Sequence, residues 1–296
     1  MKIVLFGKGG QVGWELQRAL SPLGELVALD FDSTDNCGDF TNLDGLAGTL
    51  TRHQPDIIVN AAAHTAVDKA ESEPGLARTI NALAPGVLAQ QAKLLGAWLV
   101  HYSTDYVFDG SGTQPWQETD TPGPLSVYGK TKLEGEQLIR VSGCQHLIFR
   151  TSWVYAARGA NFAKTMLRLA QERERLTVID DQIGAPTGAD LLADVTVLAL
   201  RQVLKRPQDG GLYHLAAAGQ TSWHGYAKHV LAEAKSAQSA IKIVANEIAA
   251  VPSSAFATAA ARPLNSRLDT ARLQATFGLQ LPPWQRGVDR MLAEIL

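Results

Sequence analysis

The sequence predicts an α/β protein with a doubly wound parallel sheet and a smaller, mainly C-terminal domain. In the first half of the 296 residues, short and nearly all-apolar segments alternate with segments of helical spacing. This alternation is typical of parallel strands that helices cover on both faces. A glycine-rich loop after the first apolar segment is also typical of a doubly wound parallel sheet. Beyond about residue 153 the alternation loosens, which indicates a second structural unit.

The elements expected in the first half follow from these two patterns. Apolar runs such as Lys2–Phe6 (KIVLF) are too short for helices and predict strands, while Val12, Leu16, Ala19 and Leu20 recur at helical spacing. On this basis we expect strands at 2–6, 25–29, 56–61, 98–102 and 146–150. We expect helices at 11–20, 82–95 and 128–141.

The second half of the chain predicts fewer elements and more turns. Helical spacing indicates helices at 162–173 and 190–204, with a short strand at 176–179 and a turn-rich break at 207–211. Two more helical pieces follow residue 252, and the Ala-rich stretch 253–261 is read as an ordered loop. Length alone suggests about two domains. We expect a dinucleotide-binding domain at 1–152, completed by parts of 176–220, and a substrate-binding domain at 153–175 and 221–296.

Composition excludes several classes of protein. With 46% hydrophobic and 19% charged residues the chain is not disordered. The net charge of −2 argues against a nucleic-acid or anionic-membrane partner. Two cysteines, Cys37 and Cys144, exclude a disulfide scaffold and suit a reducing compartment. The longest N-terminal apolar run is far below the roughly 20 residues of a spanning helix, so we expect a cytoplasmic protein.

The loop Gly7–Gly13 (GKGGQVG) lies between the first expected strand and the first expected helix. Glycines at this turn let a pyrophosphate approach the backbone N–H groups at the helix N-terminus. A plain strand-to-helix turn is the alternative, because a glycine pattern alone is weak. Asp30 ends the second strand, where a carboxylate accepts hydrogen bonds from the adenosine ribose and repels a 2′-phosphate. It therefore favours NADH over NADPH, and Asp39 with Phe40 would flank the adenine.

Tyr128 and Lys132 are four residues apart at the start of an expected helix, so both lie on one face. A free phenol has a pKa of about 10, and a nearby ammonium lowers it. Such a tyrosine can protonate a carbonyl oxygen while a hydride arrives at carbon. Thr104 follows the strand at 98–102, at the sheet edge where ligands bind. The alternatives are two surface residues and an N-cap threonine.

Together, and in this order, these motifs resemble the extended short-chain dehydrogenase/reductase superfamily, and within it the dTDP-4-dehydrorhamnose reductase family. The resemblance covers essentially the whole chain. Seven segments carry it: Gly7–Gly13 (GKGGQVG), Asn60–Glu71 (NAAAHTAVDKAE), Ser103–Gly110 (STDYVFDG), Pro124–Lys132 (PLSVYGKTK), Arg150–Tyr155 (RTSWVY), Asp181–Thr187 (DQIGAPT) and Arg262–Leu268 (RPLNSRL).

The resemblance implies a Rossmann-type fold that binds NADH or NADPH and reduces the C4 keto group of dTDP-4-dehydro-L-rhamnose. It implies catalysis by Thr104, Tyr128 and Lys132, with Tyr128 as the proton donor. The cofactor residues it implies are Gly7, Gly10, Gln11, Val12, Gly13, Asp30, Asp39, Phe40, Ala63, His64, Thr65, Tyr102, Tyr128 and Lys132. The substrate residues it implies are Thr104, Asp105, Trp153 and Arg262.

Other reactions of the superfamily are weighed against this one. A dehydratase would carry an Asp-Glu pair directly after the threonine, but Asp105 is followed by Tyr106. Epimerisation and reduction of a GDP-linked sugar stay open. So does a non-catalytic, dinucleotide-binding regulatory subunit, such as the beta subunit of methionine adenosyltransferase. Retention of Thr104, Tyr128 and Lys132 argues against that last class.

Two roles and one metal are further expectations. Trp153 would wall the sugar pocket, with a domain-junction core residue as the alternative. Arg262 would pair with a diphosphate, with a surface ion pair as the alternative. Mg²⁺ and a homodimer are implied by the resemblance alone. Glu15 and Asp190 are the candidate ligands of the metal. No residue spacing predicts a metal site, and His224 and His229 are five apart, off one helical face.

Overall fold

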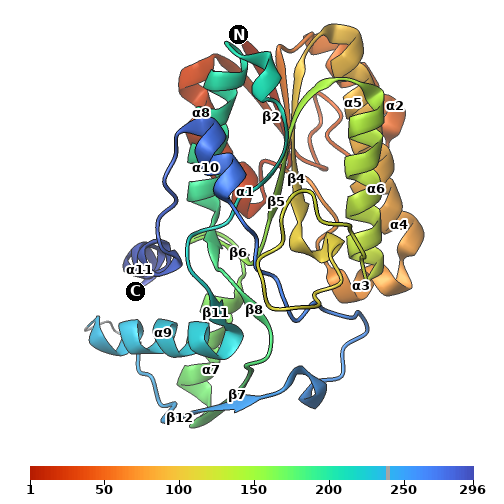
Figure 1. Ribbon diagram of the computed structural model, residues 1–296. Coiled ribbons are helices and arrows are strands. Elements are labelled where there is room, and N and C mark those ends of the chain that lie inside the picture. The colour runs from red at the N-terminus through yellow and green to blue at the C-terminus, as the bar shows by residue number, and fades with distance from the viewer. Residues whose placement is uncertain (238–240) are drawn as a thin grey trace.

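A computed structural model describes residues 1–237 and 241–296. Its centre is a six-stranded sheet with the order β10-β5-β4-β3-β1-β2, and every neighbouring pair of strands is parallel. Helices cover both faces of this sheet, and a smaller body of helices and short strands lies below it in Figure 1. The α/β class and the parallel sheet expected from the sequence are confirmed.

The elements of the first half surround the central sheet. They are β1 (Lys2–Phe6), α1 (Gln11–Leu20), β2 (Glu25–Leu29), α2 (Leu43–His53), β3 (Ile57–Asn60), α3 (Val67–Ser72), α4 (Pro74–Arg78), α5 (Ala84–Leu95), β4 (Trp98–Thr104), α6 (Val127–Ser142) and β5 (Gln145–Thr151). The first three match the expected ranges residue for residue. The helix expected at 82–95 begins as a π-helix at Thr79–Leu83, which runs directly into α5.

The second half returns once to the sheet and otherwise builds the smaller body. Its elements are β6 (Val154–Tyr155), α7 (Phe162–Glu172), β7 (Arg175–Ile179), β8 (Ile183–Gly184), β9 (Thr187–Gly188), α8 (Ala189–Val203), β10 (Gly211–His214), β11 (Thr221–Ser222), α9 (Trp223–Ser236), β12 (Glu247–Val251), α10 (Ala271–Phe277) and α11 (Trp284–Ile295). Within the described residues, β7–β12, β8–β11 and β6–β9 form two-stranded sheets.

Each face of the central sheet has its own apolar core. On one face α1 and α8 pack together and bury Leu16 and Leu192 against the strands. On the other face α2, α5 and α6 bury Leu46, Leu88 and Ile139. These helices have one apolar stripe each, so the alternating sequence pattern leads directly to the layered structure.

A third core fills the smaller body. There α7, α9 and α11 bury residues such as Leu167, Tyr226 and Val288. The chain does not divide simply by sequence, because Leu273 and Phe277 of α10 pack into the core of the central sheet. The domain boundaries stated above stay predictions.

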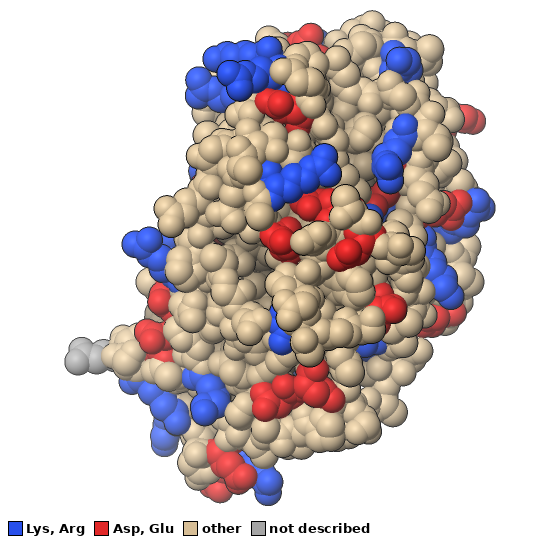
Figure 2. Space-filling model, in the orientation of Figure 1, with Lys and Arg blue, Asp and Glu red and all other residues tan. Residues whose placement is uncertain are grey.

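Several elements were not anticipated from the sequence: the helices α2, α3, α4 and α9, the edge strand β10, and the short strands β6, β8, β9, β11 and β12. β10 pairs with β5 in parallel, with Leu212 opposite Ile148. Within the described residues, none of the helices has the length and apolar character needed to span a bilayer. On the face shown in Figure 2, acidic and basic side chains are interspersed rather than gathered by sign.

Candidate active site

A cleft of about 820 Å³ opens at the carboxyl ends of the central strands. It lies where the strand order reverses, because β1 is flanked by β2 on one side and β3 on the other. Ligands of open α/β sheets bind at such a switch point. Fifteen of the residues expected in the site line this cleft: Gly7, Gly10, Gln11, Val12, Asp30, Asp39, Phe40, Ala63, Thr65, Tyr102, Thr104, Asp105, Tyr128, Lys132 and Trp153.

The glycine loop turns tightly from β1 into α1. Gly7 has a φ of 85°, a region that disfavours residues with a Cβ. The N–H groups of Gly7 and Lys8 both donate to the carbonyl oxygen of Leu29, which ties the loop to β2. Gly13 does not line the cleft; it lies inside α1, where a Cβ would overlap the carbonyl oxygen of Gly7. It therefore permits close packing rather than contact with a ligand.

Asp30 lies at the end of β2, beside the glycine loop. Its Oδ2 accepts a hydrogen bond of 2.8 Å from the N–H of Gly9, and its Oδ1 accepts one of 3.0 Å from the N–H of Phe31. These two bonds hold the carboxylate at the cleft wall. Phe40 is mostly buried and packs edge-on against Phe6, with ring centroids 5.6 Å apart.

Thr104 is the last residue of β4 and is 5% exposed. Its hydroxyl donates to Oδ1 of Asp105 over 3.0 Å and accepts a 3.2 Å hydrogen bond from the N–H of Tyr106. Asp105 is buried at the cleft floor, and this burial raises the pKa of its carboxyl to about 6. The end of β4 thus brings a hydroxyl and a poorly solvated carboxyl into the cleft.

Tyr128 is on the first turn of α6, which Ser126 caps by accepting a 3.2 Å hydrogen bond from the N–H of Gly129. Its ring meets Tyr106 edge-on at 5.6 Å. The phenol pKa is not lowered as the sequence spacing predicted. Burial raises the pKa of Tyr128 to about 12, partly opposed by a hydrogen bond with Thr104. Sequence spacing revealed the shared helix face but not the degree of burial.

Lys132 lies one turn further along α6 and is 2% exposed. Its Nζ donates to the carbonyl oxygen of Tyr102 over 2.6 Å and lies 3.2 Å from Nε2 of His101. Burial lowers the pKa of Lys132 to about 8, while the negative charge of Glu136 acts to raise it. The amine is therefore a group that can gain or lose a proton near neutral pH.

A buried ion pair fixes α6 against β5. Nε and Nη2 of Arg150 donate to the two carboxylate oxygens of Glu136 over 2.9 and 2.7 Å. Both side chains are nearly inaccessible to solvent, and the guanidinium also lies 5.0 Å from the ring centroid of Phe108. Because a bidentate pair restrains orientation as well as distance, it holds the helix that carries Tyr128 and Lys132.

The full chain, residues 1–296, matches the family model described as the RmlD substrate binding domain. A dTDP-4-dehydrorhamnose reductase of Escherichia coli (strain K12) is 60% identical over 295 residues, which span 100% of this chain and 98% of that protein. This chain belongs to the RmlD family of dTDP-4-dehydrorhamnose reductases.

Solved structures of RmlD-family proteins share the fold over their whole length. A dTDP-4-dehydrorhamnose reductase from Clostridium acetobutylicum superposes with a TM-score of 0.90 at 34% identity, covering 100% of this chain and 99% of that one. One from Bacillus anthracis, solved in complex with NADP, has a TM-score of 0.87 at 34% identity and 99% coverage of both chains.

In this RmlD-family chain, Trp153 lines the cleft and stacks on a residue that also borders a second pocket. Its φ of 48° is unusual for a residue with a side chain. Its indole stacks on Trp223, with ring centroids 3.7 Å apart. A Cβ on Gly184 would come within 2.8 Å of the Trp153 ring, so this glycine makes room for the stack.

The second pocket has a volume of about 640 Å³ and shares Tyr106 and Trp223 with the cleft. Arg262 lines this pocket rather than the cleft. Its guanidinium forms a bidentate pair with Asp68, with Nη2 2.6 Å from Oδ2. The surface ion pair that the sequence left open is therefore present, and the diphosphate role stays a prediction.

His64 contributes its backbone rather than its ring to the cleft region. Its N–H donates to Oδ1 of Asn81 over 2.8 Å, and its carbonyl oxygen accepts from Nδ2 over 3.1 Å. Asn81 lies in the π-helical turn before α5. This amide fixes the loop that carries Ala63 and Thr65, and sequence reasoning missed it because the partners are 17 residues apart.

The cleft contains polar groups that fit a dinucleotide and a sugar. Oε1 of Gln11, Oγ of Ser103 and Oγ1 of Thr151 are buried without hydrogen-bond partners, and all three residues line the cleft. Buried polar atoms normally have partners. Hydroxyl and phosphate groups of a ligand would satisfy these three.

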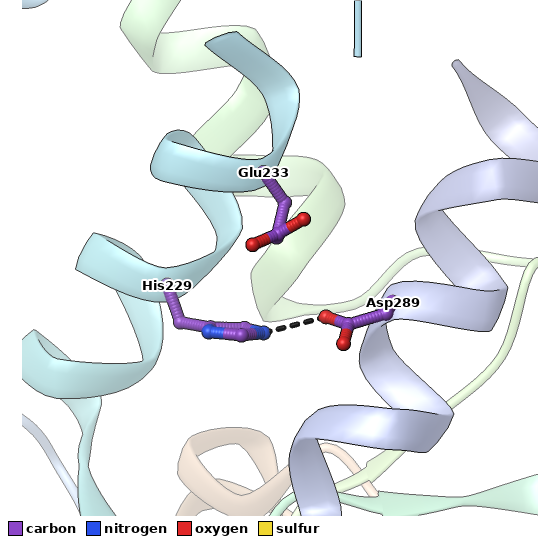
Figure 3. A group of neighbouring side chains, drawn as sticks. All are labelled: His229, Glu233 and Asp289. Atoms are coloured by element: carbon purple, nitrogen blue, oxygen red, sulfur yellow. Dashed lines mark hydrogen bonds and ion pairs between the residues drawn. The ribbon is translucent and has the colours of Figure 1, made fainter. Parts of the chain in front are cut away.

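Glu15 and Asp190, the candidate Mg²⁺ ligands, line one small pocket, where each already lies beside an arginine. Glu15 pairs with Arg18 at 3.3 Å, and Arg290 lies 3.5 Å from Asp190. A different group, His229, Glu233 and Asp289, has ligand atoms within 4.8 Å of one another where α9 meets α11 (Figure 3). Asp289 already engages Nε2 of His229 at 2.6 Å, so we assign no metal there.

Proposed function

We propose that this chain reduces the C4 keto group of dTDP-4-dehydro-L-rhamnose with NADH or NADPH and releases dTDP-L-rhamnose. One observation carries the proposal above all others: Thr104, Tyr128 and Lys132 line one cleft at the switch point of a dinucleotide-type sheet. Membership of the RmlD family and the E. coli reductase at 60% identity support the choice of substrate.

The proton chemistry follows from the state of Tyr128. With a pKa of about 12 the phenol is protonated at neutral pH, so it is an acid ready to donate to the oxygen at C4. Thr104, whose hydroxyl bonds both Tyr128 and Asp105, orients that oxygen. The bound dinucleotide supplies the hydride. Lys132 lines the same cleft and would return a proton to Tyr128 after Tyr128 has donated its own.

The two pockets together suit a sugar nucleotide. The sugar would occupy the cleft below Trp153, and the dTDP moiety would extend past Tyr106 into the second pocket. There Arg262 is the cation available to a diphosphate, in exchange for its contact with Asp68. Asp30 beside the adenosine position favours NADH, although the B. anthracis relative was solved with NADP.

The direct test is loss of NADH absorbance on addition of dTDP-4-dehydrorhamnose to the wild type and to Tyr128→Phe. We expect Tyr128→Phe to lower kcat by about 10²–10⁴-fold, the usual contribution of a general acid. Tyr226→Phe is the matched control, since its hydroxyl is buried in the smaller body without a partner. It should leave kcat unchanged.

The outcomes separate the competing functions. Unchanged turnover in Tyr128→Phe would refute the proton-donor assignment. Turnover only with GDP-linked keto sugars would show that the substrate belongs to a different class. Binding of the dinucleotide without any turnover would favour a regulatory subunit.

We also propose a cytoplasmic homodimer with no nucleic-acid or membrane partner. Both cysteines are free thiols, as expected in a reducing compartment. Trp14 of α1 and Leu198 of α8 are each 48% exposed on adjacent helices, an apolar surface suited to a second copy. Sedimentation equilibrium would show one 296-residue chain if the dimer proposal is wrong.

A further inference from the structure

Trp223 borders both pockets and has no part in the reaction described so far. It is the first residue of α9, and it lines the cleft as well as the second pocket. Its indole stacks on that of Trp153, with ring centroids 3.7 Å apart and ring planes 15° from parallel. Trp223 therefore contacts, face to face, the residue that is expected to border the sugar.

The conformation of Trp153 depends on its surroundings. Its φ of 48° lies in the left-handed region, which residues with a Cβ rarely occupy. Such a conformation persists where the surrounding structure over-determines it. One restraint is the N–H of Thr187, which donates to the carbonyl oxygen of Trp153 over 3.2 Å. Because this bond holds only the backbone, the orientation of the indole needs a restraint of its own.

Trp223 supplies that restraint and is itself held in place. Its Nε1–H donates to Oε1 of Gln182 over 3.1 Å, and Gln182 is 6% exposed. Phe162 of α7 packs against the same indole, with ring centroids 4.6 Å apart. A hydrogen bond at the ring edge and a packed aromatic neighbour together restrict the orientation of the Trp223 indole, which thus presents a fixed face to Trp153.

The strands beside Trp223 hold it at a fixed place relative to the ring of Trp153. β11 ends directly before Trp223 and pairs with β8, where Gly184 lies opposite Thr221. A Cβ on Gly184 would come within 3.0 Å of Cζ2 of Trp153. The β8–β11 pair therefore places a glycine and an indole of the smaller body next to the same ring.

We propose that Trp223, oriented by Gln182, is a positioning residue that sets where the indole of Trp153 lies in the cleft and, through it, how the sugar is aligned for reduction. The inference rests on the proposed function for the identity of that sugar. An indole face is a flat apolar surface against which the C–H groups of a sugar ring can pack. Because a misplacement of about 1 Å can cost about 10²-fold in rate, a small movement of Trp153 would slow reduction without preventing dinucleotide binding.

Steady-state kinetics of Trp223→Leu test this role. We expect kcat/KM for dTDP-4-dehydrorhamnose to fall by about 10–10²-fold, while the Kd of the dinucleotide keeps its wild-type value. Trp223→Phe retains an aromatic face, so its kcat/KM should lie closer to that of the wild type than to that of Trp223→Leu. Trp284→Phe is the matched control, because this buried indole of the smaller body lies outside both pockets. An equal loss of kcat/KM in Trp284→Phe would contradict a specific role of Trp223.

A double-mutant cycle distinguishes positioning from direct contact with the substrate. If Trp223 acts through Trp153, then Trp223→Leu should have little further effect on kcat/KM in a Trp153→Leu background, so that the two losses are not additive. Fully additive losses would overturn the proposal, because they would show that Trp223 acts independently of Trp153.

Labelling of tryptophan with ¹⁵N follows the ring of Trp153 without requiring turnover. The indole N–H signal of Trp153 is assigned by its loss in Trp153→Leu. A stacked aromatic ring shifts the resonance of a proton near its face, so we expect this signal to move in Trp223→Leu and to keep its place in Trp284→Phe. An unmoved Trp153 signal in Trp223→Leu would contradict the proposal.

Gln182→Leu provides a second test if Trp223→Leu does not fold. It removes the acceptor of the Trp223 indole N–H and leaves both indoles present, so the Trp153 signal should move and kcat/KM should fall, each by less than in Trp223→Leu. Wild-type values of both would overturn the proposal. Failure of the proposed function is a separate result, namely no turnover of dTDP-4-dehydrorhamnose by the wild type, and it would leave the Trp153 signal measurable.

Discussion

Asp105 shows how burial changes the chemistry of one residue. Its carboxyl pKa rises from 3.8 to about 6 because the carboxylate is desolvated, although hydrogen bonds from Ser266 and Thr104 oppose the rise. The folded state therefore favours the protonated form. This stabilising contribution is fully present below the unfolded pKa and is lost as the pH rises through the folded value.

Asp105→Asn should stabilise the protein at neutral pH. The variant carries no charge to bury, so we expect its free energy of unfolding to exceed that of the wild type by about 1–3 kcal/mol near pH 7. The difference should vanish at about pH 3 or below, where the carboxyl is protonated in both the folded and the unfolded chain. Thermal denaturation at the two pH values checks this, and an equal melting temperature at pH 7 would contradict it. Activity should fall, because the amide oxygen of Asn is a weaker acceptor for the hydroxyl of Thr104 than a carboxylate oxygen.

We expect Asp30 to set the cofactor preference. Its carboxylate is held by the N–H groups of Gly9 and Phe31 at the cleft wall, where it would accept from ribose hydroxyls and repel a 2′-phosphate. We expect Asp30→Ala to raise the ratio of kcat/KM for NADPH over NADH by about 10-fold or more, equivalent to about 1.4 kcal/mol. Asp32→Ala, at an exposed position two residues on, removes the same charge and should leave the ratio unchanged. An equal change of the kcat/KM ratio in both variants would refute a local effect of Asp30.

Among the elements, α1 depends most strictly on one position. Gly13 packs against the carbonyl oxygen of Gly7, and a Cβ there would overlap it. We expect Gly13→Ala to cost about 1–3 kcal/mol of stability and to weaken dinucleotide binding at least 10-fold, because the loop must move. Gly48→Ala, in α2 with no atom within 4 Å of its Cβ, should stabilise by about 0.4–1 kcal/mol. Chemical denaturation and dinucleotide fluorescence titration measure both, and wild-type behaviour in Gly13→Ala would be inconsistent with this packing.

The elements also show where sequence reasoning succeeds. β1, α1 and β2 match because each has a clear apolar pattern of its own, and Leu16 of α1 packs in the same core as Ile3 and Leu5 of β1. β10 (GLYH) has four residues and begins with glycine, and only its pairing with β5 makes it a strand. The π-helical turn at Thr79–Leu83 carries no local signal either, since Asn81 finds its partner in the backbone of His64.

The sequence could predict most of the residues that line the cleft, but not their electrostatics. The order of the glycine loop, Thr104 and Tyr128 identified the cleft, because parallel strands bring their carboxyl ends together. The predicted direction of the Tyr128 pKa shift was wrong. Burial raises this pKa, and burial depends on Tyr106 and the surrounding layers rather than on the spacing of residues in the sequence. His101 carried no signal, because one histidine in an apolar strand gives no indication of which group it faces.

At the scale of the whole molecule, the central sheet and the smaller body both contribute residues to the walls of the two pockets. The cleft lies at the edge of the sheet, and the second pocket is lined mainly by residues of the smaller body, including Phe162 and Met166. Tyr106 and Trp223 line both. A ligand long enough to reach both, such as a sugar nucleotide, would contact both bodies at once.

The most direct measurement is the transfer of deuterium from NADH that carries deuterium at both C4 positions of the nicotinamide. We expect one deuterium of the labelled cofactor to arrive at C4 of the rhamnose ring when dTDP-4-dehydrorhamnose is converted, as read by mass spectrometry and proton NMR of the product. Tyr128→Phe should suppress that product while dinucleotide binding is kept. Product without deuterium at C4, or deuterium at another carbon, would contradict a reduction at this site.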